Sequence, residues 1–83
     1  MSTSVRTSGQ LGPILRKLRK EKGWSQQTLG EKVGLSQERI SVIENHPEKV
    51  SLDSLLTVLM ALDMEMQIAP KSTGIRSLPK ENW

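Results

Sequence analysis

The residues best suited to chemistry in this chain follow Ser36, in the sequence SQERIS. An amide, a carboxylate, a guanidinium and a hydroxyl stand close together there, on Gln37, Glu38, Arg39 and Ser41. On a helix surface, side chains of these types can hydrogen-bond to base edges or to phosphates. The chemistry that the sequence first suggests is therefore recognition of nucleic acid.

Two short helices are expected to position these side chains. Leu29 and Val33 are four residues apart, so they share one face of the first helix. Ile40 and Ile43 are three apart and share one face of the second. Gly34 lies between the helices, where a helix ends in a left-handed residue that glycine adopts without steric cost. This pattern is typical of a helix-turn-helix; the alternative is a helical hairpin that only fills a core.

Three helices are predicted to begin in the same way, with a serine N-cap preceded by an apolar residue that packs one turn into the helix. The apolar residue, cap and packing partner are Trp24, Ser25 and Leu29, then Leu35, Ser36 and Ile40, then Val50, Ser51 and Leu55. An earlier helix is expected over about residues 9–22, from the apolar stripe Leu11, Ile14, Leu15 and Leu18. Pro13 would allow that helix to start as late as Gly12.

A fourth helix is expected from Leu52 to about Leu62, and its apolar residues cover more than one side. Such a helix must bury both sides, which indicates a partner subunit. Residues 64–69 then alternate apolar and polar, the period of a strand, with Met64, Met66 and Ile68 on one face. We expect this strand to pair with its own copy and these three residues to line the dimer interface. The alternative is an extended segment packed on the fourth helix.

Composition narrows the class of protein. The chain has 83 residues, a formal net charge of +3 and no cysteine, so it lacks a disulfide framework and a thiolate zinc site. No apolar run approaches the ~20 residues that span a membrane, and the N-terminus is not a secretory signal, so we expect a cytoplasmic protein. The basic residues crowd one stretch, Arg16, Lys17, Arg19, Lys20 and Lys22, which is either a solvated helix face or a phosphate-facing patch.

Residues 10–62 resemble a Cro/C1-type (XRE-like) helix-turn-helix domain. The resemblance is carried by the basic first helix with its continuation, LRKLRKEKGWSQ, and by Gly30, Gly34 and Glu44. The whole chain resembles the HipB-type antitoxins of the HipA/HipB toxin–antitoxin system, with MEMQI as a short C-terminal strand and Trp83 at the end of the tail.

This resemblance implies a bacterial homodimer that binds palindromic double-stranded operator DNA, regulates its own operon and neutralises a HipA-type serine/threonine kinase toxin. Toxin binding would involve Trp83. The resemblance also implies that Gln26 holds a phosphate, that Gln37 reads a base, and that Arg19 and Glu44 form a structural ion pair.

The expected fold class is mainly α: a four-to-five-helix, lambda-repressor-like domain with a short C-terminal strand pairing across a homodimer. Residues 1–8 are expected to be disordered, 9–70 to form the DNA-binding and dimerisation domain, and 71–83 to form a flexible tail. We expect base contacts from Gln37, Glu38, Arg39 and Ser41, and phosphate contacts from Ser25, Gln26, Gln27, Lys17, Lys20 and Asn45.

Other functions remain open at this point. Glu38 repels phosphate, so it either accepts a hydrogen bond from a cytosine N4 or points at Arg39. The chain could be a stand-alone phage-type or housekeeping repressor without a toxin, or an adaptor that has lost DNA binding. An enzyme is the weakest interpretation, because the sequence has one histidine, His46, and no glycine-rich phosphate loop before a helix. Neither a cofactor nor a metal is expected.

Overall fold

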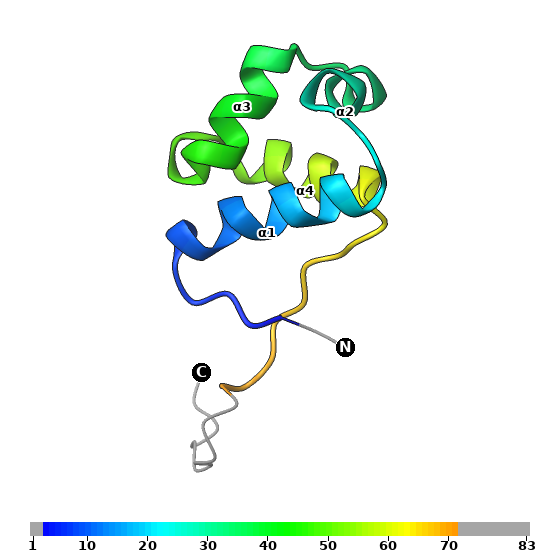
Figure 1. Ribbon diagram of the computed structural model, residues 1–83. Coiled ribbons are helices and arrows are strands. Elements are labelled where there is room, and N and C mark those ends of the chain that lie inside the picture. Colours follow the sequence, from blue (N-terminus) through cyan, green and yellow to red (C-terminus); the bar gives the residue numbers. More distant parts are fainter. Residues whose placement is uncertain (1–2, 72–83) are drawn as a thin grey trace.

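The computed structural model describes residues 3–71 of the chain. Within this part, the helices in order are α1 (Ser8–Glu21), α2 (Gln26–Val33), α3 (Gln37–Asn45), the 3-10 helix η1 (Pro47–Lys49) and α4 (Leu52–Ala61). α3 packs on α2 and on α1, and α2 also packs on α4 (Figure 1). The prediction of a mainly helical domain with a helix-turn-helix is confirmed, with α2 and α3 as its two helices.

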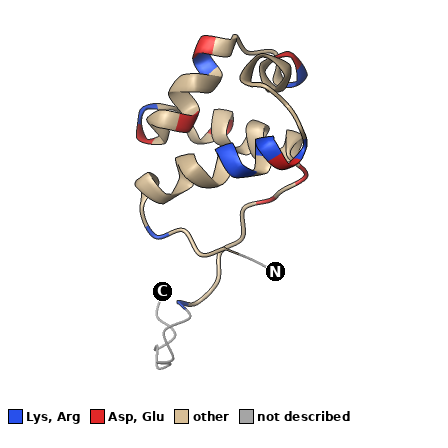
Figure 2. Cartoon of the chain, viewed as in Figure 1, with Lys and Arg blue, Asp and Glu red and all other residues tan. Residues whose placement is uncertain are grey.

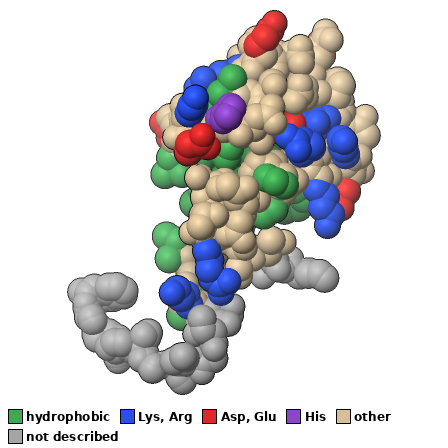
Figure 3. All heavy atoms as spheres, turned by 60° about the vertical axis from the view of Figure 1, so that its left-hand side comes forward, with side chains coloured by type: hydrophobic (Ala, Val, Ile, Leu, Met, Phe, Trp, Pro, Cys, Tyr) green, Lys and Arg blue, Asp and Glu red, His purple; other side chains and the backbone are tan. Residues whose placement is uncertain are grey.

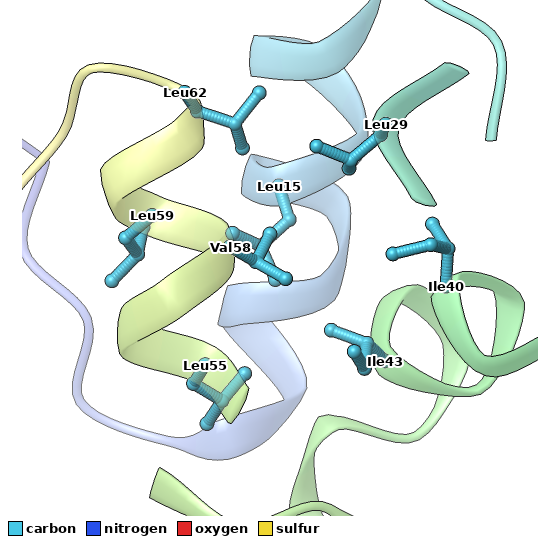
Figure 4. Close-up of a cluster of buried hydrophobic side chains, with 8 residues drawn as sticks. All are labelled: Leu15, Leu29, Ile40, Ile43, Leu55, Val58, Leu59 and Leu62. Atoms are coloured by element: carbon cyan, nitrogen blue, oxygen red, sulfur yellow. The ribbon is translucent and has the colours of Figure 1, made fainter. Parts of the chain in front are cut away.

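The core lies where the four α-helices meet. Its buried members are apolar and come from every α-helix: Leu15, Leu29, Ile40, Ile43, Leu55, Val58, Leu59 and Leu62. Figure 4 shows these side chains converging between the ribbons. Both helices of the helix-turn-helix are held to α1 and α4 through this cluster, so α3 is fixed in its orientation by apolar burial.

The three predicted serine caps are confirmed. The side-chain oxygens of Ser25, Ser36 and Ser51 accept hydrogen bonds from the backbone N–H groups of Thr28, Arg39 and Ser54, at 3.0, 3.1 and 3.1 Å. The apolar residue before each cap, Trp24, Leu35 or Val50, packs against the core. Gly34 ends α2 with φ +75°, the left-handed conformation that the turn requires.

The first helix starts within one residue of the expected position. It begins at Ser8 and passes through Pro13, so the alternative start as late as Gly12 is wrong. The backbone N–H of Thr7 donates to the side chain of Gln10 at 3.0 Å, which satisfies one of the free donors at this helix end. This local cap stabilises the turn before Pro13, whose missing N–H then breaks only one bond of the helix.

Two glycines allow close backbone contact. A Cβ added at Gly12 of α1 would collide with the carbonyl oxygen of Glu44, near the end of α3. A Cβ added at Gly30 would collide with the carbonyl oxygen of Leu35, in the turn of the helix-turn-helix. Gly12 therefore sets the distance between α1 and the end of α3, and Gly30 lets the turn pass close over α2.

The strand predicted at 64–69 is not formed in the single chain. Residues 64–71 follow α4 without regular secondary structure, and Met64, Met66 and Ile68 are 44%, 48% and 98% exposed. A strand requires hydrogen bonds to a neighbouring strand, and residues 3–71 of one chain supply none. On α4, Leu52 and Met60 are also exposed, whereas Leu55, Val58 and Leu59 are buried. One side of α4 thus faces the core, and the other remains uncovered.

Candidate nucleic-acid interface

The outward face of α3 carries the polar residues that the sequence singled out. Gln37 and Glu38 are exposed, and Arg39 and Ser41 are partly exposed, because Ile40 and Ile43 occupy the opposite face in the core. The start of α3 carries adjacent acidic and basic residues, as Figure 2 shows. Glu38 and Arg39 are neighbours in sequence, yet no salt bridge joins them among the residues that the structure describes. Both side chains are therefore available to an external ligand.

Below this face lies a buried ion pair between α1 and α3. The Nε and Nη2 atoms of Arg19 donate to the two carboxylate oxygens of Glu44, at 2.6 and 3.1 Å. Arg19 is 7% exposed and Glu44 is 2% exposed. Arg19 also donates to the backbone carbonyl of Trp24 at 2.8 Å, which ties the start of α2 to the same pair. The ion pair thus connects α1, α2 and α3 at one point.

Glu44 is held in its charged form. Burial alone raises the pKa of its carboxyl group, but hydrogen bonds from Arg19 and Gln26, together with the positive charges of Arg19 and Arg16, outweigh burial and lower that pKa from the ordinary value of 4.5. An ionised carboxylate accepts hydrogen bonds and donates none. A group that hydrogen-bonds to the Glu44 carboxylate must therefore present an N–H or O–H group to it, as Arg19 and Gln26 do.

Two glutamines continue this hydrogen-bond chain to the surface. The Nε2 atom of Gln26, at the start of α2, donates to Glu44 at 3.1 Å. The Nε2 atom of Gln37, at the start of α3, donates to Oε1 of Gln26 at 2.9 Å. The predicted phosphate contact and the predicted base contact are therefore joined to each other, and through Gln26 to the core.

Arg16 is a residue that the sequence interpretation left out of the site. Its Nη2 atom donates to Asn45 at 2.8 Å, and Nδ2 of Asn45 donates to the carbonyl and hydroxyl oxygens of Ser41, at 3.0 and 3.2 Å. The Nε atom of Arg16 also lies 3.6 Å from Glu44. A sequence signal existed, because Arg16 and Arg19 are three residues apart and share a helix face.

Some basic residues of α1 form salt bridges within the protein, and others are exposed without a salt-bridge partner among the described residues. Arg19 is buried against Glu44, and Lys22 pairs with Asp63 at 2.7 Å. Lys17 and Lys20 are exposed, and together with Pro13, Arg16 and Glu21 they line a shallow surface hollow. Lysine and arginine side chains form separate groups on the face drawn in Figure 3. Of the five basic residues in the stretch, the two predicted phosphate contacts are the ones without a salt-bridge partner among the described residues.

The remaining predicted positions lie around the helix starts. Ser25 and Gln27 are exposed at the start of α2, where free backbone N–H groups favour an anion. Val42 lies four residues after Glu38 on α3 and is only partly buried, and the sequence interpretation did not consider it. His46 lies 3.4 Å from Glu48, and residues 3–71 contain no group of side chains arranged to hold a metal ion. Trp83 lies outside the described residues.

Sequence comparison places these features among known proteins. The helix-turn-helix family HTH_3 matches residues 15–68. The antitoxin HipB of Escherichia coli strain K12 is 31% identical over 75 residues, which cover 83% of this chain and 85% of that protein. The antitoxin HipB of Escherichia coli O6:H1 is 34% identical over 59 residues, covering 71% of this chain and 63% of that protein.

Solved structures give the same relatives. A chain of the HipA–HipB–O2–O3 complex superposes with a TM-score of 0.79 at 27% identity, covering 86% of this chain and all 100% of that chain. A chain of the HipB–O4 20mer complex superposes with a TM-score of 0.77 at 28% identity, covering 83% of this chain and 97% of that one. No helix among residues 3–71 is long and apolar enough to cross a membrane.

Proposed function

We propose, on the premise that this chain belongs to the helix-turn-helix family and to the HipB antitoxins within it, that it is a sequence-specific repressor that also acts as an antitoxin. The observation that supports DNA binding most directly is the hydrogen bond between Gln26 and Gln37, at the starts of α2 and α3. The Nε2 atom of Gln37 lies 2.9 Å from the Oε1 atom of Gln26. It puts a candidate phosphate ligand and a candidate base ligand side by side on one surface.

Base recognition is assigned to α3. With α3 in the major groove, Gln37, Glu38, Arg39 and Ser41 face the bases. Asn45 donates to the hydroxyl oxygen of Ser41, so the Ser41 proton remains free to be donated to an acceptor on a base. Val42, half-exposed beside them, can contact a thymine methyl group. Glu38 can accept from a cytosine N4, a bond that would offset the repulsion between its carboxylate and the phosphates.

Phosphate contacts are assigned to the groups around α3. Ser25, Gln26 and Gln27 lie at the start of α2, where the helix dipole also favours an anion. Lys17 and Lys20 extend this surface along α1, and Asn45 contributes at the end of α3. These contacts hold the protein in register on the duplex without reading sequence.

Dimerisation is assigned to the uncovered side of α4 and to residues 64–69. Leu52 and Met60 are 56% and 71% exposed, and Met64, Met66 and Ile68 continue the apolar surface. Pairing of residues 64–69 with the same segment of a second copy would satisfy their backbone groups and cover α4. Two copies of α3 would then lie ~34 Å apart, one turn of B-DNA.

The antitoxin part rests on the relatives, one of which was solved in a complex named HipA–HipB–O2–O3. By this likeness the chain would bind palindromic operator DNA of its own operon in the bacterial cytoplasm and neutralise a HipA-type serine/threonine kinase. Trp83 is proposed as the toxin anchor, since tryptophan is among the residues most often found at interface hot spots. Titration of the cognate kinase into wild type and Trp83→Ala tests it: weaker binding by the variant is expected, and equal affinity contradicts the anchor.

DNA binding is tested by selection from random-sequence duplexes, followed by footprinting of the enriched sites. We expect palindromic sites with half-sites one helical turn apart. Failure to enrich any duplex above the input would contradict the proposed function. Enrichment of sites without two-fold symmetry would contradict the proposal that the protein binds DNA as a dimer, but not the proposal that α3 recognises bases.

A further inference from the structure

We propose that residues 3–7 form an additional strand beside residues 64–69 of the same chain when two copies associate, so that a four-stranded sheet holds the dimer. This inference rests on the dimer in the proposed function. It goes beyond that dimer because it gives the segment before α1, which the DNA-binding face does not use, a role in assembly.

The segment before α1 and the segment after α4 lie on the same side of the molecule. In Figure 1, residues 3–7 turn back beneath α1 and pass the chain that leaves α4, and Figure 4 shows the two segments coming close together beyond Leu62. In Figure 1, α2 and α3 lie above α1, on the opposite side. Residues 3–7 are therefore placed to contact residues 64–69, and not a duplex bound by α3.

The direction of this segment is set by Gln10. Its Oε1 atom accepts hydrogen bonds from the backbone N–H groups of Arg6 and Thr7, at 2.6 and 3.0 Å. Thr7 has extended backbone angles, φ −138° and ψ 156°. In an extended chain, the backbone groups of successive residues point to opposite edges, so an extended course directs those of Val5 away from Gln10. Among residues 3–71 no hydrogen bond reaches the backbone of Val5, and this edge is free to join a sheet.

The side-chain patterns of the two segments fit together. One face would carry Thr3 and Val5 beside Met64, Met66 and Ile68, and the other would carry Ser4 and Arg6 beside Glu65 and Gln67. Val5 is 45% exposed in the single chain, so it has apolar area left to bury. Arg6 and Glu65 have opposite charges, and neither has a salt-bridge partner in the part of the chain that the structure describes. Apolar and oppositely charged cross-strand pairs both stabilise a sheet.

A second copy is needed because a sheet of two strands is marginally stable in water. Residues 3–7 and 64–69 accordingly form no strand in the single chain. When two copies of residues 64–69 pair, each copy keeps one outer edge with unpaired N–H and C=O groups. Residues 3–7 of each chain would cover that edge, and the apolar face of the four-stranded sheet would cover the exposed sides of both α4 helices. Dimer formation and ordering of residues 3–7 should therefore depend on each other.

Asparagine substitutions at two neighbouring positions test this role. Val5→Asn removes the apolar side chain from the face turned toward α4, whereas the matched control Ser4→Asn places the same amide on the other face. Sedimentation equilibrium of the full chain gives the dissociation constant of the dimer. We expect Val5→Asn to raise it at least about 10-fold, because the burial of a valine in each chain is lost. Ser4→Asn should stay within about 2-fold of wild type.

The strand position is tested by engineered disulfides, since the chain contains no cysteine. Val5→Cys is combined in three double variants with Met64→Cys, Met66→Cys or Ile68→Cys. A disulfide requires Cα atoms within about 7 Å, which residues facing each other on neighbouring strands satisfy. On mild oxidation of the dimer, we expect at least one of the three pairs to form a disulfide within one chain. The control Ser4→Cys with Met66→Cys, whose thiols would lie on opposite faces, should form none.

The outcomes separate this inference from the proposed function. A wild-type chain that stays monomeric at every concentration contradicts the dimer of the proposed function. A dimeric wild type whose dissociation constant is unchanged in Val5→Asn overturns the inference alone. So does a set of double variants that forms no disulfide, or forms one only between chains. If circular dichroism shows that Val5→Asn does not fold, the disulfide result decides.

Discussion

Replacing Arg19 by methionine tests the role of the buried ion pair. Met is similar in length but leaves Glu44 in the interior without its two strongest donors. Removing one partner of a buried pair costs about 3–5 kcal/mol, because the remaining charge is uncompensated. Since a small domain has a total stability of about 5–15 kcal/mol, this loss should lower the unfolding midpoint severely.

A matched control is available on the same helix. Lys22 pairs with Asp63 at 2.7 Å, but Asp63 is 80% exposed in its side chain. Pairs of this kind contribute about 0–1 kcal/mol, so Lys22→Ala should differ little from wild type. The contrast between the two variants separates the effect of burial from the effect of losing a positive charge on α1.

The pH dependence gives a second, qualitative readout. The pKa of Glu44 is lowered in the folded protein from the ordinary value of 4.5, so its contribution to stability is complete above that pH and is lost as pH falls through the folded pKa. In Arg19→Met the hydrogen bonds and the charge of Arg19 are gone, and only Gln26 and Arg16 remain to oppose the effect of burial on the pKa of Glu44. The lowering of that pKa should therefore shrink, and this variant should lose less stability than wild type on acidification.

Urea unfolding followed by far-UV circular dichroism at pH 7 and pH 4 measures both effects. All variants should be compared at one protein concentration, because a dimer's stability depends on it. The argument is refuted if Arg19→Met loses no more stability at pH 7 than Lys22→Ala does. It is also refuted if its pH dependence equals that of wild type.

Three further predictions concern other parts of the chain. Lys17→Ala or Lys20→Ala should weaken binding to all duplexes alike and make the salt dependence of log K shallower by about one unit, and an unchanged slope for both would mean that this helix face only contacts solvent. Gly12→Ala should lower the thermal midpoint strongly and Gly9→Ala should not lower it, because the added methyl group would collide with a backbone carbonyl at Gly12 and would meet only the Thr7 hydroxyl, at an ordinary contact distance of 4.0 Å, at Gly9; equal midpoints would contradict this packing. Ile68→Asp should shift sedimentation toward monomer, whereas a variant that stays dimeric at micromolar concentration would place the interface on α4 alone.

The parts of the fold that the sequence predicted are those set by neighbouring residues. Ser25, Ser36 and Ser51 act as caps through bonds to residues three positions on, so each is visible in a short window. The alternative start of α1 at Gly12 was too late, because Pro13 suggested a helix boundary and the Thr7–Gln10 cap was overlooked.

The parts that could not be predicted from local patterns depend on distant residues. Gln26 and Glu44 are 18 positions apart, and Arg16 and Asn45 are 29 apart, so no short window reveals their hydrogen bonds. The Arg19–Glu44 pair came from family resemblance and not from spacing. The strand expected at 64–69 would need a second copy of the chain as its partner, because residues 3–71 of one chain supply no neighbouring strand.

The central claim is that Gln37 reads sequence from the start of α3, and Gln37→Ala on the selected operator tests it most directly. Fluorescence anisotropy with the operator and with a random duplex of equal length, at one salt concentration, gives the two affinities to compare. The account predicts a loss of about 1–3 kcal/mol on the operator and nearly unchanged binding to the random duplex. An equal loss on both duplexes would contradict it, because Gln37 would then only hold the backbone.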